Sequence, residues 1–410
     1  MNQSGAIVTE QSTDDYRISY AGVMMGSYPR PLAVLERGEG CHVWDVDGRR
    51  YLDFLGGIAV NSLGYAHPAL VAAVSQQIAT LSHVSNYFAT PPQIALATRL
   101  QQITGAGATG RTYFGNSGAE AMEAAFKLAR LNNASGKRTR ILSLTNSFHG
   151  RTMGSLALTG KPALQAPFAP MPGGVEHIDS TIAALEAAID ETVAALIFEP
   201  IKGEAGVVDL PEGFIERARE LTREHGALLI IDEIQTGVAR TGAWFAYQKH
   251  NILPDAVAIA KGLGGGVPIG ALVTFGAASE LYQHGHHGST FGGNPLVTAA
   301  ALAVLDEIEQ SGLVANAETR GRQLGEGIRA LESPLIAEVR GQGLLIGIGL
   351  VEPIAKQLTE AALERGLIIN AANESSIRLA PPLIIGDAEV AEFLDLFAAT
   401  LETVQNGVAR

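Results

Sequence analysis

The sequence predicts an α/β fold, with a mostly parallel, doubly wound sheet in a large domain and a smaller α+β domain after it. Short apolar runs alternate with helical stretches between about residues 93 and 275, which is typical of strands joined by crossover helices. The runs are continuously apolar, as in strands buried on both faces. At 410 residues the chain also exceeds what one hydrophobic core normally supports.

The N-terminal section precedes this alternation. Its first fifteen residues are polar and have no periodicity, so we expect a frayed arm. Two half-apolar runs, Cys41–Asp45 and Arg50–Phe54, flank an Asp47-Gly48 turn and predict a β-hairpin. Apolar residues at helical spacing predict a helix over Pro68–Leu81.

The central section carries the alternation itself. The expected helices cover Gln93–Ile103, Glu120–Leu131, Ile182–Ile189 and Gly213–His225. The expected strands are the apolar runs between and after them: Arg111–Gly115, Arg140–Leu144, Ala194–Ile201, Leu228–Asp232, Ala256–Ala260 and Ala271–Phe275.

The pattern changes near Asn294-Pro295. A helix rich in Ala and Leu runs to about Ile308, and new strand-like runs follow it. We therefore divide the chain into an N-terminal arm with part of the small domain (1–65), a large domain (66–300) and a C-terminal small domain (301–410). The expected strands of the last section are Glu338–Gly341, Leu344–Leu350, Gly366–Ile369 and Ser376–Ala380.

Composition limits the possible functions. A net charge of −13 disfavours nucleic acid and anionic membranes as partners. With one cysteine, Cys41, no internal disulfide is possible, which suits a reducing compartment. The sequence contains neither a signal-peptide pattern nor an apolar stretch of the ~20 residues that span a bilayer. We expect a soluble cytoplasmic protein.

Two charged residues end neighbouring apolar runs. Asp232 ends Leu228–Asp232, and Lys261 follows Ala256–Ala260 and opens a glycine-rich turn. Both would lie beyond the carboxyl ends of strands, where open α/β sheets bind ligands. Such a pair suits pyridoxal 5′-phosphate, because the amine condenses with the aldehyde and the carboxylate holds the pyridine nitrogen protonated. Taken singly, each residue could equally be a loop lysine or a turn former.

Four further segments border the same expected crevice. Gly115–Glu120 opens a helix and suits a phosphate cradle, although a plain helix cap has the same pattern. Asn146–Thr152 offers Phe148 for ring stacking and Arg151 for a carboxylate, and Glu199–Glu204 ends another strand. Gly288–Pro295 adds two hydroxyls. The histidines before it (His284, His286, His287) have no carboxylate or cysteine to complete a metal site, so we expect none.

Together these motifs resemble the class-III, fold-type-I pyridoxal-phosphate aminotransferases, and within them the acetylornithine aminotransferases, from about Tyr28 to Val390. The resemblance implies that Lys261 and Asp232 are the catalytic pair. It implies a cofactor site formed by Ser117, Gly118, Ala119, Phe148, Asp232, Glu233, Ile234, Gln235, Lys261 and Thr290. It also implies a homodimer with shared active sites, in which Ser289 and Thr290 reach the neighbouring subunit.

The resemblance further implies how two kinds of substrate are bound. Tyr28 and Ser289 would contact substrate, Arg151 would bind the α-carboxylate of the acylated donor, and Arg378 would bind that of glutamate. Glu204 would pair with Arg378 until glutamate displaces it. The implied reaction transfers the δ-amino group of N2-acetyl-L-ornithine to 2-oxoglutarate.

Other activities remain open at this stage. Ornithine δ-aminotransferases and ω-aminotransferases acting on succinylornithine or 4-aminobutyrate share these motifs, although Ile368–Ala371 favours the acetylornithine type. A glutamate-1-semialdehyde aminomutase is disfavoured by the segment His287–Pro295. A cofactor-binding regulator would need a DNA-binding module, and no segment is long or basic enough to supply one.

Overall fold

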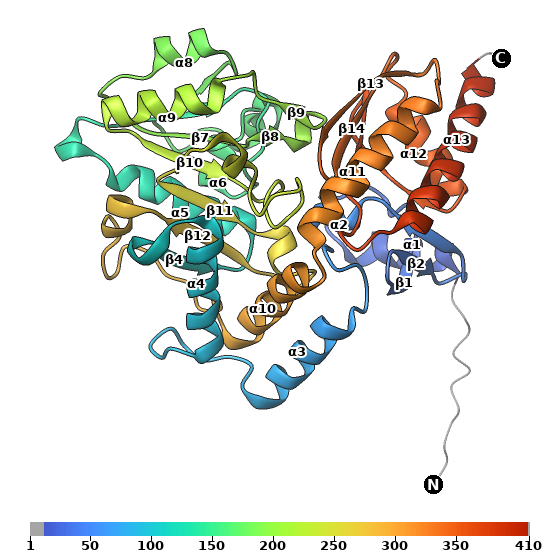
Figure 1. Ribbon diagram of the computed structural model, residues 1–410, viewed down its shortest axis with the longest axis horizontal. Coiled ribbons are helices and arrows are strands. Elements are labelled where there is room, and N and C mark those ends of the chain that lie inside the picture. The colour runs from blue at the N-terminus through green and yellow to red at the C-terminus, as the bar shows by residue number, and fades with distance from the viewer. Residues whose placement is uncertain (1–11, 409–410) are drawn as a thin grey trace.

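A seven-stranded sheet forms the centre of the larger part of the molecule. The computed structural model describes residues 12–408 (Figure 1). The strand order is β4-β12-β11-β10-β7-β5-β6, and only β12 runs antiparallel to its neighbours. The strands are β4 (Arg111–Gly115), β5 (Arg140–Leu144), β6 (Val175–Ile178), β7 (Val193–Phe198), β10 (Leu228–Asp232), β11 (Ala256–Ile259) and β12 (Gly270–Thr274). The predicted α/β class and mostly parallel sheet are confirmed.

Helices cover both faces of this sheet because its strands are apolar on both sides. Leu228 and Ile230 pack with the buried face of α5, whereas Leu229 and Ile231 pack in the cluster that contains α9. Alternate residues of one strand thus enter two different cores. The helices of this part are α3 (Pro68–Thr80), α4 (Pro91–Thr104), α5 (Gly118–Leu131), α6 (Met153–Leu158), α7 (Pro162–Gln165), α8 (Ile182–Ala188), α9 (Phe214–His225) and α10 (Pro295–Gln310).

Two four-stranded sheets form the smaller part, which lies beside the large sheet (Figure 1). One is β13-β14-β17-β16 and the other is β1-β2-β3-β15, so N-terminal and C-terminal segments share a sheet. The division at residues 65 and 300 stays a prediction, and α10 runs across residue 300. The elements are β1 (Leu35–Glu39), β2 (His42–Asp45), β3 (Arg50–Asp53), β13 (Ile336–Gln342), β14 (Leu345–Leu350), β15 (Leu367–Ile368), β16 (Asn370–Asn373), β17 (Ser376–Leu379), α11 (Leu313–Ala330), α12 (Ala355–Glu364) and α13 (Asp387–Val408).

The expected N-terminal arm contains a helix. Residues 1–11 lie outside the described part, but Thr13–Val23 forms α1, so the expectation of a frayed arm through residue fifteen was wrong for Thr13 to Asp15. Ser12 and Asp15 form a capping box that begins the helix. The helix escaped the sequence pattern because none of its residues is buried, and without a core-facing stripe there is no periodicity to detect.

The remaining elements are short connections. They include α2 (Gly56–Ala59) and the two-residue strands β8 (Ile201–Lys202) and β9 (Val208–Asp209). The expected strand Ala194–Ile201 is therefore two strands, β7 and β8, since the chain turns at Glu199-Pro200. That turn lies at the edge of the site described below.

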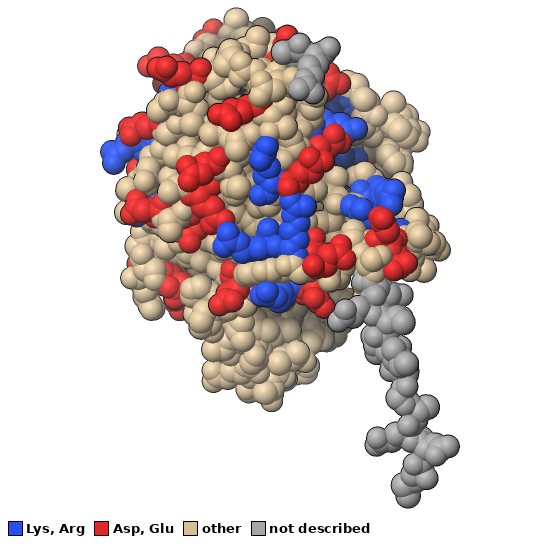
Figure 2. Space-filling view, turned by 90° about the vertical axis from the view of Figure 1, so that its right-hand side faces the viewer, with Lys and Arg blue, Asp and Glu red and all other residues tan. Residues whose placement is uncertain are grey.

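One face of the smaller part shows how the charges are distributed. In Figure 2, basic side chains gather near the middle of this face and acidic side chains border them. The basic cluster on this face is thus surrounded by acidic side chains, on a chain whose net charge is −13.

Candidate active site

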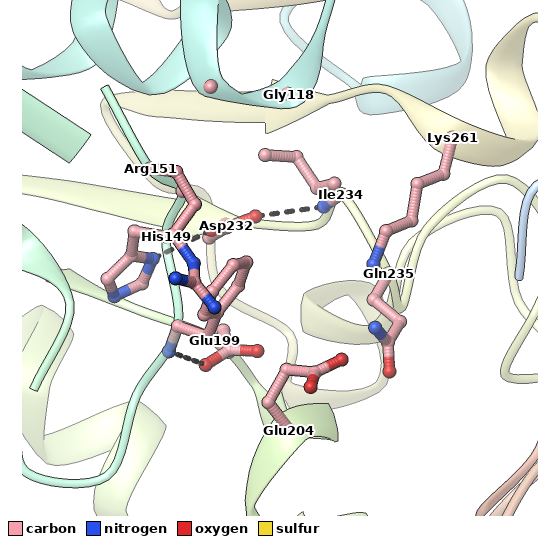
Figure 3. Close-up of a pocket in the computed structure, with 12 residues that line it drawn as sticks. Gly118, His149, Arg151, Glu199, Glu204, Asp232, Ile234, Gln235 and Lys261 are labelled. Atoms are coloured by element: carbon pink, nitrogen blue, oxygen red, sulfur yellow. Dashed lines mark hydrogen bonds and ion pairs between the residues drawn. The ribbon is translucent and has the colours of Figure 1, made fainter. Parts of the chain in front are cut away.

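A cavity of about 270 Å³ lies at the carboxyl ends of β10 and β11, beside the first turn of α5. Charged and aromatic side chains from loops far apart in the sequence line it (Figure 3). The parallel pairing of Ile230 with Ala256 aligns the two strands, so that the residues after them meet at one edge of the sheet. The lining residues are Gly118, Ala119, Phe148, His149, Gly150, Arg151, Glu199, Glu204, Asp232, Ile234, Gln235 and Lys261.

The first turn of α5 forms one end of the cavity. Ser117 is the N-cap, and its hydroxyl accepts a hydrogen bond from the backbone N–H of Glu120 at 3.2 Å. The N–H groups of Gly118 and Ala119 have no acceptor within the helix, as at every helix start, and both residues line the cavity. A Cβ on Gly118 would lie 2.9 Å from Cδ1 of Ile234. This end is therefore a narrow, positively polarised cradle suited to a phosphate.

Asp232 occupies the floor of the cavity, between His149 and Lys261 in the view of Figure 3. Its Oδ2 lies 2.7 Å from Nδ1 of His149, and its Oδ1 accepts the Ile234 N–H at 3.0 Å. Burial lowers the pKa of His149, but the hydrogen bond and charge of Asp232 outweigh burial and raise it overall. The contact with Asp232 thus favours the protonated form of His149.

Glu199 lines the cavity and contacts the backbone of Phe148. Its Oε2 accepts the Phe148 N–H at 2.9 Å. Burial raises the pKa of Glu199 to about 7, and the charge of Asp232 adds to this while His149 and Lys261 oppose it. Arg151 lies over the Phe148 ring, with Cζ 5.7 Å from its centroid. The aromatic ring and the guanidinium thus belong to one side of the cavity.

Lys261 has a strained backbone and a perturbed amine. Its φ is +43°, in the left-handed region that non-glycine residues rarely adopt, and such strain clusters at functional sites. Burial lowers the pKa of Lys261 to about 8, and the charge of Arg378 adds to this. A lysine amine that loses its proton near pH 8 is available as a nucleophile and as a base.

A buried ion pair closes the remaining side. Nη1 of Arg378 donates to Oε1 of Glu204 at 2.5 Å and to Oε1 of Gln235 at 3.1 Å, and Nη2 donates to Oδ1 of Asn370 at 2.8 Å. Arg378 is 2% exposed. Burial raises the pKa of Glu204, but the charge and hydrogen bond of Arg378 outweigh this and lower it.

These features fit pyridoxal phosphate. The cradle at α5 suits its phosphate, Asp232 suits its pyridine nitrogen, Phe148 suits its ring face and Lys261 suits its aldehyde. The decisive observation is that all four, which come from four separate loops, line one cavity.

Comparison with known proteins then identifies the family. The model of the family "Aminotransferase class-III" matches residues 24–401. The chain belongs to the class-III aminotransferases. It is 53% identical over 392 residues to the acetylornithine aminotransferase of Mycobacterium tuberculosis, covering 95% of this chain and 97% of that protein. The corresponding protein of Streptomyces coelicolor is 51% identical over 393 residues, covering 95% and 96%.

Solved structures give the same fold. The ornithine aminotransferase of Toxoplasma gondii superposes with a TM-score of 0.91 at 31% identity, covering 97% of this chain and 96% of that one. This confirms a fold-type-I aminotransferase. Class-III aminotransferases use pyridoxal phosphate, which is the group that the cavity fits.

Several residues expected in the class-III site do not line this cavity. Glu233 turns away, and its carboxylate accepts hydrogen bonds from the Thr236 hydroxyl and the Tyr247 N–H. Ser117 acts as the helix cap. Tyr28, Ser289 and Thr290 are also absent from the lining; Tyr28 is 72% exposed beside α1.

Three residues of the site were missed at the level of sequence. The sequence motifs assign no role to His149, place Glu199 only at the border of the crevice, and include Asn370 only in a segment typical of one subfamily. His149 is 83 residues from its partner Asp232, so no local pattern predicts their contact. The position of Glu199 at the end of β7 was the available signal.

Two other sequence expectations can be set against the described residues. Between residues 12 and 408, no group of three or more His, Cys, Asp or Glu side chains is placed to hold a metal ion. The helices in that range are also too short or too polar for any of them to cross a bilayer.

Proposed function

We propose that this aminotransferase converts N2-acetyl-L-ornithine and 2-oxoglutarate into N-acetyl-L-glutamate 5-semialdehyde and L-glutamate, a step of arginine biosynthesis. The observation that carries the proposal is the Glu204–Arg378 ion pair beside Lys261. Glu204 can neutralise Arg378 while one substrate is bound and can move away when another substrate offers a carboxylate to Arg378. The names of the relatives that are 53% and 51% identical agree with it.

The residues divide the chemistry among them. Bound pyridoxal phosphate supplies an aldehyde for the substrate amine and an electron-withdrawing ring. Nζ of Lys261 would take the proton from Cδ of the donor and return it to the carbon of the cofactor's aldehyde group, acting first as base and then as acid. Asp232, which is oriented by its contact with His149, would keep the ring nitrogen protonated. Gly118 and Ala119 anchor the phosphate with backbone N–H groups.

Arginines discriminate the two substrates. Arg151 binds the α-carboxylate of N-acetylornithine through its planar guanidinium. With this donor the Glu204–Arg378 pair stays closed, because no second carboxylate competes for Arg378. With glutamate or 2-oxoglutarate, Glu204 leaves and Arg378 receives the α-carboxylate. Arg378 is thereby neutralised when N-acetylornithine is bound and positively charged towards the substrate when glutamate or 2-oxoglutarate is bound.

We propose further that the enzyme works in the cytoplasm as a homodimer with shared active sites. Apolar side chains are exposed on α3, on the segment after it and on the loop before α10; Val71 is 51%, Ile78 58%, Tyr87 92%, Phe88 67% and Phe291 58% exposed. Exposed apolar side chains in such numbers favour a protein interface. Nδ2 of Asn116 donates to the Ser289 hydroxyl at 3.2 Å, and Ser289 is not among the residues that line this chain's cavity, which supports a role for it in a neighbour's site.

Ornithine or another ω-amine remains the alternative donor. The chain shares its fold with an ornithine aminotransferase, at 31% identity. That identity is well below the 53% shared with the M. tuberculosis protein, so we rank N-acetylornithine first.

The test is a single-turnover experiment without an acceptor. The purified holoenzyme is mixed in turn with N-acetylornithine, ornithine, 4-aminobutyrate and glutamate, and conversion of the cofactor to its amine form is followed by absorbance. We expect N-acetylornithine to react much faster than ornithine and 4-aminobutyrate, and glutamate to react as well. A faster reaction with ornithine or 4-aminobutyrate would overturn the choice of donor.

A further inference from the structure

The Glu204–Arg378 pair poses an electrostatic problem when it opens. Arg378 is 2% exposed, and the carboxylate of Glu204 lies mostly buried beside it. When a substrate carboxylate takes Arg378, Glu204 is left as a poorly solvated anion. A buried charge without a partner is strongly unfavourable. The Glu204–Arg378 pair acts as a specificity gate, in the sense that it opens to let Arg378 bind a substrate carboxylate, and this gate needs a second cation within reach of Glu204.

The backbone around Glu204 is held in place. Nδ2 of Asn373 donates to the carbonyl of Ala205 at 2.9 Å, and Nη2 of Arg340 donates to that of Gly206 at 2.6 Å. Nζ of Lys161 donates to the carbonyl of Glu204 itself at 3.0 Å. Because these contacts fix the loop, opening must occur by rotation of the Glu204 side chain rather than by movement of the loop.

Three cations act on the Glu204 carboxylate, namely Arg378, Lys261 and Lys161, and together they lower its pKa against the opposing effect of burial. In the glutamate reaction Arg378 is taken by the substrate and Lys261 is engaged in the proton transfer. Lys161 is the cation that remains. Within residues 12–408 it forms no ion pair of its own, so its charge is available.

The backbone at Lys161 is held in place, so that its ammonium group can bind the Glu204 carboxylate. Its neighbour Gly160 forms a parallel bridge with Thr145, and Pro162 begins α7 directly after it. An ammonium group has three donors, and the carbonyl of Glu204 uses one of them. The other two can donate to the Glu204 carboxylate once that side chain has rotated back towards its own backbone.

We propose that Lys161 is a positioning residue of the specificity gate, which binds the carboxylate of Glu204 when Arg378 binds the α-carboxylate of glutamate or 2-oxoglutarate. This inference rests on the proposed function. It assigns Lys161 to one half of the reaction only: the gate opens for the dicarboxylic substrates and stays closed for the acylated donor.

The test compares both half-reactions in the holoenzymes of Lys161→Met, Lys161→Gln and Lys161→Arg, with Lys356→Met as a control. Lys356 is exposed and pairs only loosely with Glu360, at 3.8 Å. We expect Met and Gln to slow the glutamate half-reaction and raise the KM for 2-oxoglutarate by about tenfold. The N-acetylornithine half-reaction should change by less than about twofold, and Arg should restore most of the loss.

A double-mutant cycle separates this role from a structural one. In a Glu204→Gln background there is no charge to receive, so Lys161→Met should have no further effect on the glutamate half-reaction. Equal losses in both half-reactions, no loss in either, or a full additional loss in the Glu204→Gln background would overturn the proposal. If the wild type reacts with glutamate but not with N-acetylornithine, the proposed donor is wrong, and the glutamate data still decide the role of Lys161.

Discussion

Lys261 combines burial with nearby positive charge, and both disfavour its ammonium form. Burial and the charge of Arg378 lower its pKa to about 8. The amine is therefore protonated below pH 8 and free above it, and only the free amine attacks an aldehyde. We predict that the rate at which the apoprotein takes up pyridoxal phosphate, measured by absorbance, rises through about pH 8 and then levels off. A rate that still climbs towards pH 10, as for an ordinary lysine, would contradict this.

The buried pair of His149 and Asp232 makes a second prediction at the residue scale. His149→Phe leaves Asp232 buried without its cation, which should lower the free energy of unfolding of the apoprotein by about 3 kcal/mol. Pairing raises the pKa of His149, so its stabilisation is complete below the ordinary histidine pKa and is lost as pH rises through the raised value. Urea denaturation at several pH values should show the gap between wild type and variant narrowing at high pH; a gap that widens would be inconsistent with an imidazolium.

The residues of the site were only partly predictable from the sequence. Lys261, Asp232, Phe148 and Arg151 were found because each follows a strand, and strand ends are local features. The contact of His149 with Asp232 depends on how two loops meet in three dimensions, so the sequence could not reveal it. Glu233 shows the converse error: it adjoins Asp232, but alternation sends its side chain into the core.

At the scale of elements, α5 should determine how firmly the cofactor is held. Gly118→Val adds bulk where even a Cβ would lie 2.9 Å from Cδ1 of Ile234 and so narrows the cradle. We expect the dissociation constant for pyridoxal phosphate to rise by at least about tenfold, as measured by dialysis and fluorescence titration. Gly407→Ala, in open space on α13, is the matched control. Unchanged retention in Gly118→Val would place the phosphate elsewhere.

The elements themselves were predictable to very different degrees. The central strands were located to within a few residues because burial on both faces makes them continuously apolar. In contrast, α1 has no buried residue and β6 is only partly buried, so neither stands out in the pattern. The strand order, which brings β15 beside β3, reflects pairing between distant segments and could not be derived from local spacing.

At the scale of the whole molecule, shared active sites predict complementation between inactive chains. Lys261→Ala lacks the amine, and the double variant Ser289→Ala with Thr290→Ala lacks the hydroxyls offered to its neighbour. A mixed dimer would contain one intact site, so mixing and reassociating the two should restore up to about a quarter of wild-type activity. No recovery, with mixed dimers demonstrated by mass spectrometry, would show that the hydroxyls serve their own chain.

The chemistry proposed for this enzyme depends on Lys261 holding pyridoxal phosphate in the cavity at the carboxyl edge of the sheet. Borohydride reduction of the holoenzyme fixes the cofactor covalently to the lysine that carries it, and proteolysis with mass spectrometry then locates that lysine. We predict the added mass of the reduced cofactor on the peptide containing Lys261 and its loss in Lys261→Ala. Attachment to another lysine, or no attachment in a protein with transaminase activity, would show that Lys261 does not carry the cofactor.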